Sequence, residues 1–164
     1  VPDEPHLFDH LTALDHLILF SRLYGVADGP TRAEAILADA GLHDQRLSFP
    51  GELSRGMKQK LVIACALLHR PEALVLDEPL TGLDPAAMRR MKRTVSDTAA
   101  AGASVIVSSH MLHLVEEVCD RVLIVSHGKS VLEGTLEEIR TQLPDVDADA
   151  DLETLFLKAT GGDQ

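Results

Sequence analysis

The chain has 164 residues, of which 45% are hydrophobic and 25% charged, enough for a globular fold with a buried core. Its 26 acidic and 15 basic residues give a formal net charge of −11. This balance argues against a nucleic-acid partner, because phosphate neutralisation needs clustered Lys and Arg. The longest apolar run, residues 61–68, is far short of the roughly 20 residues that span a bilayer.

The ends and the cysteines bear on where the protein works. Cys65 and Cys119 lie far apart among apolar residues, which predicts reduced, buried thiols in a cytosolic protein. No secretory signal is visible. The chain begins at Val1, not at Met, in the loop-like string VPDEP, so we expect the N-terminus to be a cut through a longer protein.

The first 70 residues are predicted to be mostly helical. Thr12 is a good N-cap with Asp15 three residues later, so a helix begins there and closes at Gly25. A second helix is expected over about residues 31–40, before Gly41.

The pattern then changes from helices to alternating strands and helices. A third helix runs from Ser54 to about residue 69, and the apolar run that ends at Asp77 is read as a fully buried strand. Asp84 and Pro85 are expected to begin the next helix. It leads to a strand over residues 104–108, and this order argues for parallel pairing in an α/β sheet.

The last third continues with short elements. A helix is expected over residues 112–119, then a strand over 121–126 that returns as a hairpin over 129–132. Thr135 and Glu138 form a predicted capping box for a further helix. An Asp-rich linker and a short C-terminal helix follow.

Three strings carry possible chemistry. Asp77 and Glu78 end a strand, where one carboxylate can hold Mg²⁺ and the other can polarise a water, although two plain surface acids fit the pattern equally. The segment Ser54-Arg55-Gly56 at a helix start can bind an anion, but it also fits an ordinary serine N-cap. The segment Ser108-Ser109-His110 ends the next strand; its histidine could contact a phosphate or be structural.

The order of these strings resembles the second half of an ATP-binding cassette (ABC) ATPase. LSRGMKQKL (residues 53–61) is similar to the family's L-S-G-G-Q signature, and LVLDEP (74–79) to its Walker B strand. TGLDP (81–85) matches the D-loop, and SSH (108–110) the switch histidine. The resemblance covers essentially the whole chain, because DLETLFLKATGG (151–162) looks like the end of cassettes that serve ABC-2-type exporters.

The resemblance implies a role for each matching residue around the nucleotide. Asp77 would bind Mg²⁺ through water, and Glu78 would orient or deprotonate the attacking water. His110 would contact the γ-phosphate. These are positioning and charge-stabilising roles, which is what phosphoryl transfer requires.

The signature and the D-loop would act across a subunit interface. Ser54, Arg55 and Gly56 would form the cofactor-binding segment, with Ser54 and Gly56 contacting the γ-phosphate of a nucleotide held by the opposite subunit. Asp84 would lie in the D-loop at that interface.

Two departures from the family pattern stand out. Arg55 replaces the first glycine of the signature and Met57 replaces its glutamine, a form that is similar to the exporter branch. VPDEP resembles the Q-loop region, but Asp3 stands where glutamine is usual. Asp3 is therefore a candidate metal contact whose role, like the coupling role of this loop, is open.

The family's phosphate loop, G-x-x-x-x-G-K-[ST], is expected before Val1. Within the chain, Gly128-Lys129-Ser130 fails the pattern because Leu123 stands at the position of the first glycine, so a hairpin turn is expected there. We therefore expect these 164 residues alone to bind ATP poorly and to hydrolyse essentially none.

The resulting fold expectation is an α/β, incomplete P-loop NTPase fold of the ABC type with a mostly parallel sheet. Residues 1–70 would form the Q-loop region and the helical subdomain with the signature. Residues 71–134 would form the catalytic part with Walker B, D-loop and switch histidine, and residues 135–164 a C-terminal helical tail.

The resemblance implies the ATP-hydrolysing subunit of an ABC transporter that powers export, with ATP and Mg²⁺ as cofactors. Its partners would be a second ABC ATPase subunit in a head-to-tail dimer and a multi-span membrane permease, with no nucleic acid. It would sit in the cytoplasm, peripherally on the inner face of the cell membrane. The alternatives are a soluble ABC ATPase without a transport role and a truncated, non-catalytic interaction module.

Overall fold

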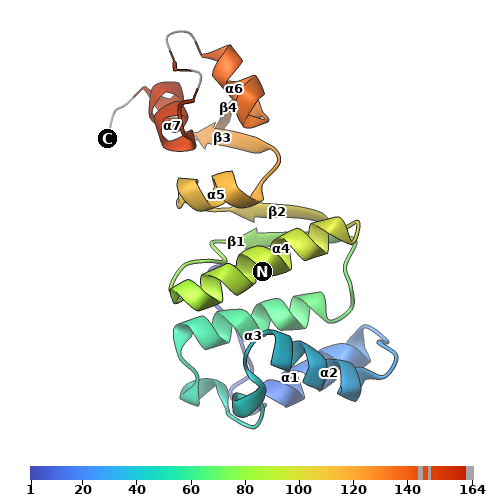
Figure 1. Ribbon diagram of the computed structural model, residues 1–164. Helices are drawn as coiled ribbons and strands as arrows, with labels where there is room; N and C mark the ends of the chain where they lie inside the picture. Colours follow the sequence, from blue (N-terminus) through green and yellow to red (C-terminus); the bar gives the residue numbers. More distant parts are fainter. Residues whose placement is uncertain (144–145, 148, 162–164) are drawn as a thin grey trace. The chain divides into compact units, whose positions relative to one another are not determined.

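The computed structural model describes residues 1–143, 146–147 and 149–161, and the chain forms two compact units, Val1–Ser108 and Ser109–Gln164 (Figure 1). In the described part of the chain, no helix has the length and apolar character needed to cross a membrane. The finer division predicted at residues 70 and 134 stays a prediction.

The first unit begins with a helical part. It contains α1 (Ala13–Leu23), α2 (Gly29–Asp39) and α3 (Arg55–Leu67), with short 3-10 turns over His43–Gln45 and Pro50–Glu52. All three predicted helices are present. α2 begins two residues earlier than expected, because Pro30 fits the first helical turn, where its missing N–H costs nothing.

Local hydrogen bonds fix the entry into α1. The predicted capping box is present, since the Thr12 hydroxyl accepts from the Asp15 N–H while the Asp15 carboxylate accepts from the Thr12 N–H. The buried His16 ring accepts from the Phe8 N–H at 2.9 Å and contacts the Thr12 carbonyl at 2.7 Å. The segment before α1 is thereby tied to the helix that follows it.

The helices share one apolar core. Burying each large side chain contributes about 1.5–3 kcal/mol relative to exposure. The buried members are Ala13, Leu17, Ala33, Leu37, Leu42, Leu53, Leu61, Ala64, Cys65 and Leu68.

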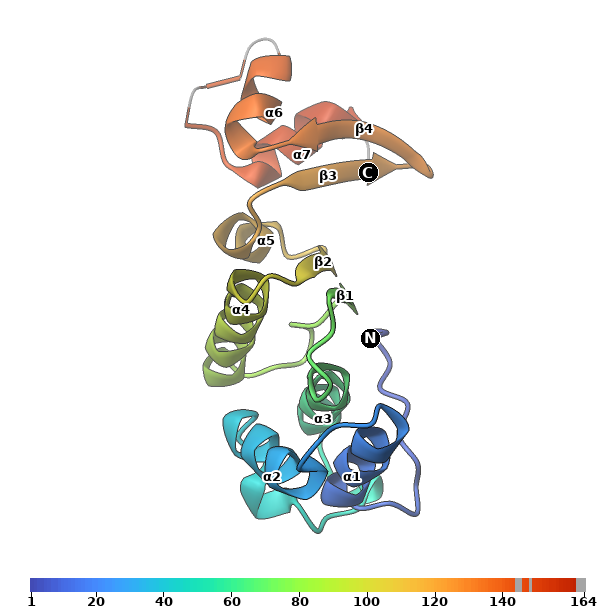
Figure 2. The same cartoon turned by 90° about the vertical axis from the view of Figure 1, so that its right-hand side faces the viewer.

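The sheet of the first unit is parallel, as predicted. β1 (Ala73–Asp77) pairs with β2 (Ser104–Ser108) in a register that sets Asp77 opposite Ser108. The crossover contains α4 (Pro85–Ala100), which lies on one face of the two strands (Figure 2). On the free edge of β1, the Val1 nitrogen donates to the Val75 carbonyl at 2.8 Å, and the Asp77 N–H donates to the Val1 carbonyl at 2.9 Å.

The expectation that β1 is buried on both faces is wrong. Leu74 and Leu76 are 5% and 1% exposed, but Val75 is 57% exposed and its β2 neighbour Ile106 is 63% exposed. An apolar run of five residues looks the same in a sequence whether one or both faces are covered. Asp77 lies on the same face as Val75, because strand side chains alternate.

The described residues of the second unit form a hairpin and three helices. Its elements are α5 (Leu112–Val118), β3 (Val122–Ser126), β4 (Lys129–Gly134), α6 (Leu136–Gln142) and α7 (Leu152–Thr160). β3 pairs antiparallel with β4, so the predicted hairpin is confirmed.

Two details of the second unit also follow the prediction. His127 and Gly128 form the turn with φ of 49° and 74°, and Lys129 and Ser130 begin β4, so this G-K-S string is a hairpin turn. The capping box of Thr135 and Glu138 is present at the start of α6. The predicted Asp-rich linker includes residues 144, 145 and 148, which lie outside the described residues.

Candidate functional site

The signature segment (residues 53–61) begins at the N-terminus of α3. The Ser54 hydroxyl accepts a hydrogen bond from the Met57 N–H at 3.2 Å, which is the geometry of a serine N-cap. The remaining first-turn N–H groups have no partner within the helix, so this end carries a partial positive charge. The predicted contacts of Ser54, Arg55 and Gly56 with a nucleotide stay predictions.

An ion pair joins the signature segment to the N-terminal segment. The Arg55 guanidinium donates to the Asp3 carboxylate at 3.0 Å, and the two side chains are 57% and 40% exposed. These two residues are the charged departures from the family pattern, and they contact each other across 52 positions of sequence. Sequence reasoning singled out both residues but did not predict their contact.

The signature segment also packs against the D-loop segment (residues 81–85). A Cβ added to Gly56 would lie 3.0 Å from the Gly82 carbonyl oxygen and 3.3 Å from a methyl carbon of Leu83. Gly82 itself has a φ of 74°, a conformation that side chains rarely adopt. Only a glycine at position 56 therefore allows this approach of helix and loop without a shift.

Asp84 caps α4 at the end of the D-loop segment, as predicted. Its carboxylate accepts from the N–H groups of Ala86 and Ala87, both at 2.9 Å. The bond from Ala87 is the main cause that holds the pKa of Asp84 below its ordinary value, and the charges of Lys60 and Arg90 act in the same direction. Its expected place at a subunit interface stays a prediction.

The carboxylate of Asp77 meets a hydroxyl at the end of the parallel sheet. Ser108 lies opposite Asp77 in the register of β1 and β2, and its hydroxyl donates to the Asp77 carboxylate. Sequence reasoning did not assign this partner. The signal was present, because two five-residue strands on either side of one crossover helix end at these two residues.

Glu78 has a backbone that is unusual for its residue type. Its φ is 47°, in the left-handed region that costs a residue with a side chain about 1–3 kcal/mol. The Glu78 N–H donates to the Ser108 carbonyl at 2.9 Å, and its carboxylate accepts from the Thr81 hydroxyl at 3.2 Å. The first bond fixes the backbone of Glu78 against β2, and the second holds its carboxylate. Thr81 is a second partner that the sequence did not reveal.

His110 follows Ser108 by two residues and belongs to the second unit. It is exposed and precedes α5, where the Met111 N–H donates to the Ser109 hydroxyl at 3.1 Å. Its role toward a phosphate stays a prediction.

The oxygen atoms at the end of β1 and β2 fit a magnesium ion bound with a nucleotide. Mg²⁺ prefers oxygen ligands and keeps several waters, using one or two carboxylates plus substrate phosphates. Asp77 and Ser108 supply a carboxylate and a hydroxyl of this kind. Among the described residues, no three His, Cys, Asp or Glu side chains gather to hold a metal by themselves. The carboxylate of Asp3 is engaged by Arg55, and its metal contact stays a prediction.

Known sequences support one family. The family described as "ABC transporter" matches residues 1–81. The chain is 35% identical over 165 residues to the ABC-type transporter ATP-binding protein EcsA of Bacillus subtilis (strain 168), covering 99% of this chain and 66% of that protein. It is 36% identical over 136 residues to the Nod factor export ATP-binding protein I of Burkholderia orbicola (strain AU 1054), covering 82% of this chain and 45% of that protein.

Solved structures agree with these sequences. The structure of an ATP-binding subunit of an ABC transporter has a TM-score of 0.90 and 34% identity, covering 97% of this chain and 66% of its own. A dimeric, post-hydrolysis structure of the ATP-binding cassette MJ0796 bound to ADP and Pi has a TM-score of 0.73 and 25% identity, covering 81% of this chain and 60% of its own. The chain thus spans less than two thirds of the length of these proteins, and its fold class is confirmed as α/β of the ABC type. The chain belongs to the family of ABC transporter ATP-binding proteins.

Proposed function

We propose that this chain supplies the Walker B, signature and D-loop parts of an ATPase that hydrolyses ATP with Mg²⁺. The arrangement of Glu78 carries the proposal. An acidic residue is held in a costly left-handed conformation at a strand end, directly after a carboxylate that a neighbouring hydroxyl orients. Such strain persists where the surroundings fix it, and it gathers at functional sites.

Each residue has a task in this proposal. Asp77 and Ser108 would hold a magnesium ion, which would neutralise charge on the phosphates. Glu78 accepts a hydrogen bond from the attacking water and takes its proton, with Thr81 fixing the carboxylate. His110 donates to the γ-phosphate from the chain segment that follows β2.

The signature segment acts on a second subunit. Ser54, Arg55 and Gly56 present the positive end of α3 to a nucleotide held by the opposite ATPase subunit of a head-to-tail dimer, with Asp84 at the interface. A dimeric cassette with ADP and Pi among the structural relatives supports this assembly. We name ATP as the bound anion because the chain belongs to the family of ABC transporter ATP-binding proteins.

The ATPase drives export through a separate multi-span membrane subunit, and the protein works at the inner face of the cell membrane. The word "export" in the name of one relative supports the direction. In the first unit, the segment after Asp3 contributes to a cavity of about 190 Å³ that suits a contact with that subunit. Tyr24 and His69, whose rings stack at 3.9 Å, line it together with Val1, His6, Leu7, Phe20, Val62, Cys65, Ala66.

Asp77→Asn tests the magnesium site in a protein that carries this chain after a phosphate loop. Removing the charge should raise the Mg²⁺ concentration for half-maximal ATP turnover at least about tenfold, as loss of an oriented metal partner does elsewhere. Asp44→Asn is the matched control, because the Asp44 side chain is 92% exposed and lies outside the site. An unchanged Mg²⁺ requirement in Asp77→Asn would remove Asp77 from the metal site.

A further inference from the structure

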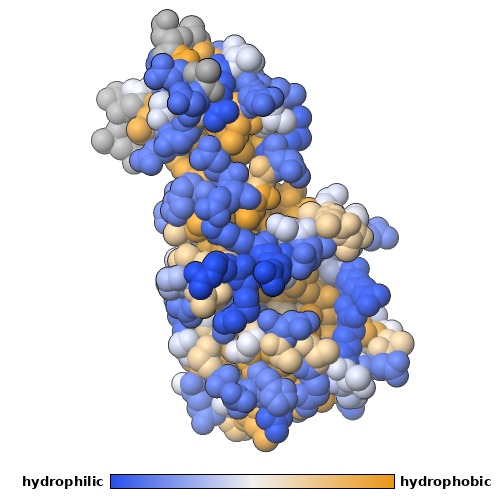
Figure 3. Space-filling view, viewed as in Figure 1, coloured by the Kyte–Doolittle hydropathy of each residue, from blue (hydrophilic) through white to orange (hydrophobic). Residues whose placement is uncertain are grey.

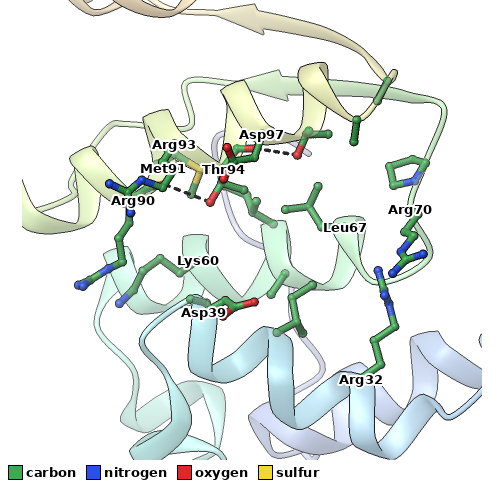
Figure 4. Close-up of a pocket in the computed structure, with 18 of the residues that line it drawn as sticks. Arg32, Asp39, Lys60, Leu67, Arg70, Arg90, Met91, Arg93, Thr94 and Asp97 are labelled. Atoms are coloured by element: carbon green, nitrogen blue, oxygen red, sulfur yellow. Dashed lines mark hydrogen bonds between the residues drawn. The ribbon is translucent and has the colours of Figure 1, made fainter.

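A groove of about 940 Å³ lies between α2, α3 and α4 of the first unit. Its floor is apolar, with Ile36 on α2, Ile63 and Leu67 on α3, and Met91 on α4. Figure 3 shows apolar surface between α4 and the helices below it, and Figure 4 shows Leu67 and Met91 directed into the groove. None of the groove residues belongs to the site of Asp77, Glu78 and Ser108.

The rim of this groove is basic although the chain is acidic. A third of the chain's 15 basic residues line it, against only three of its 26 acidic residues. The basic residues are Arg32, Lys60, Arg70, Arg90 and Arg93, and the acidic ones are Asp39, Glu72 and Asp97. A chain with a net charge of −11 therefore presents one groove with an excess of positive charge.

Like charges lie close together at this rim, where the Asp84 carboxylate also acts on Lys60 and Arg90. In the described part of the chain, no salt bridge joins any of the five to a carboxylate. At one end of the groove lie Arg32 and Arg70, and at the other Lys60 and Arg90 (Figure 4).

Two of these cations, Arg32 and Lys60, have a lowered pKa. Burial is the main cause that lowers the pKa of Lys60, the charge of Arg90 lowers it further, and the Asp84 carboxylate acts in the opposite direction. The pKa of Arg32 is lowered in the same way by burial and by Arg70. Carboxylates placed at the two ends would relieve both repulsions.

We propose that this groove binds an amphipathic helix of a partner protein, with its apolar side chains on the groove floor and Asp or Glu side chains at the two basic ends. Three helices around an apolar furrow provide the ridges and grooves that a fourth helix packs into. Complementary charge at both ends fixes the register of the bound helix. Ile63 and Met91 are already buried by the chain, whereas Ile36 and Leu67 are half-buried, so a polyanion without apolar groups would leave Ile36 and Leu67 uncovered.

A designed peptide is the probe for this proposal. It is a labelled amphipathic helix of roughly 18 residues, because shorter isolated helices are marginal in water. Leucines occupy one face and glutamates flank it, and a second peptide has lysines in place of the glutamates. Fluorescence anisotropy measures the binding of each peptide to the 164-residue chain without nucleotide, so the result does not depend on the proposed ATPase function.

We expect binding to depend on the charge of the peptide and on the position of the substituted residue in the chain. The glutamate peptide should bind at least about tenfold tighter than the lysine peptide, and added salt should reduce that difference. Arg90→Glu with Arg93→Glu should weaken binding at least about tenfold. Arg89→Glu should change it less than about twofold, because Arg89 is exposed on the same helix but does not line the groove.

A second variant guards against a loss of folding. Arg70→Glu lies at the opposite end and is exposed, and circular dichroism verifies that each variant keeps its helices. No binding of the glutamate peptide, equal binding of both peptides, or equal binding to Arg89→Glu and to folded groove variants would each overturn the proposal.

Discussion

At the scale of single residues, backbone geometry decides which residue types fit at two positions of the candidate site. Gly56 permits the contact between signature and D-loop segments, and Glu78 holds a positive φ that a side chain normally avoids. Gly56 was recognisable from the sequence because its motif is local. The strain at Glu78 was not, because it depends on the bond from its N–H to Ser108, thirty positions away.

Gly56→Ala should destabilise the chain by about 1 kcal/mol, at the low end of the range for overpacking. The new methyl group meets the Gly82 carbonyl oxygen at 3.0 Å, so the D-loop segment has to shift. Urea unfolding followed by circular dichroism measures the change. Gly51→Ala is the control, since a Cβ there meets nothing within 4 Å, and a stability gain in Gly56→Ala would contradict the close approach.

The ion pair of Asp3 and Arg55 should be weak but detectable. Both side chains are more than a third exposed, and pairs of this kind contribute about 0.2–1 kcal/mol. A double-mutant cycle of Asp3→Ala and Arg55→Ala isolates the coupling, which should fall toward zero at about 1 M salt. Strictly additive single variants at low salt would show that the pair contributes nothing to stability.

At the scale of elements, helix starts followed from the sequence while strand burial did not. Thr12, Asp84 and Thr135 were expected as N-caps, and for Ser54 a cap was one of two interpretations. All four cap their helices, because a cap depends on residues within three positions. The exposure of Val75 depends instead on what covers the sheet, and no local pattern encodes that.

Thr12→Ala should cost about 1 kcal/mol at neutral pH, because the N–H of Asp15 loses its acceptor. Thr31→Ala is the matched control within the first turn of α2, where no side-chain cap bond is present. Thermal or urea unfolding measures the stability of both variants. Equal losses of unfolding free energy in the two variants would show that the capping box does not stabilise the chain.

The capping box at Thr12 and Asp15 also predicts how the free energy of unfolding depends on pH. Bonds from the side chain and backbone of Thr12 lower the pKa of Asp15 below its ordinary value of 3.8. A lowered folded-state pKa contributes stability that is complete above the unfolded value and is lost as the pH falls through the folded value. The difference in unfolding free energy between wild type and Asp15→Asn should therefore be constant near neutrality and shrink below pH 3.8. A difference that grows on acidification would contradict the cap.

At the scale of the whole molecule, the order of the motifs in the sequence is sufficient to predict the family. The signature, Walker B, D-loop and switch strings occur in one order, and the comparisons confirm the resemblance. Side-chain partnerships between distant segments, such as Asp3 with Arg55 and Asp77 with Ser108, required the fold. Parallel strand register could have suggested the second pair, whereas nothing in the sequence relates residue 3 to residue 55.

ATP turnover by Glu78→Gln, in a protein that carries this chain after a phosphate loop, tests the role of Glu78 directly. The amide keeps the size and the bond to Thr81 but cannot take a proton, so turnover should fall at least roughly a hundredfold while ATP binding is unchanged. Glu72→Gln, an exposed acid just before β1, should leave turnover unchanged. Turnover near wild type in Glu78→Gln would show that this carboxylate does not activate the attacking water.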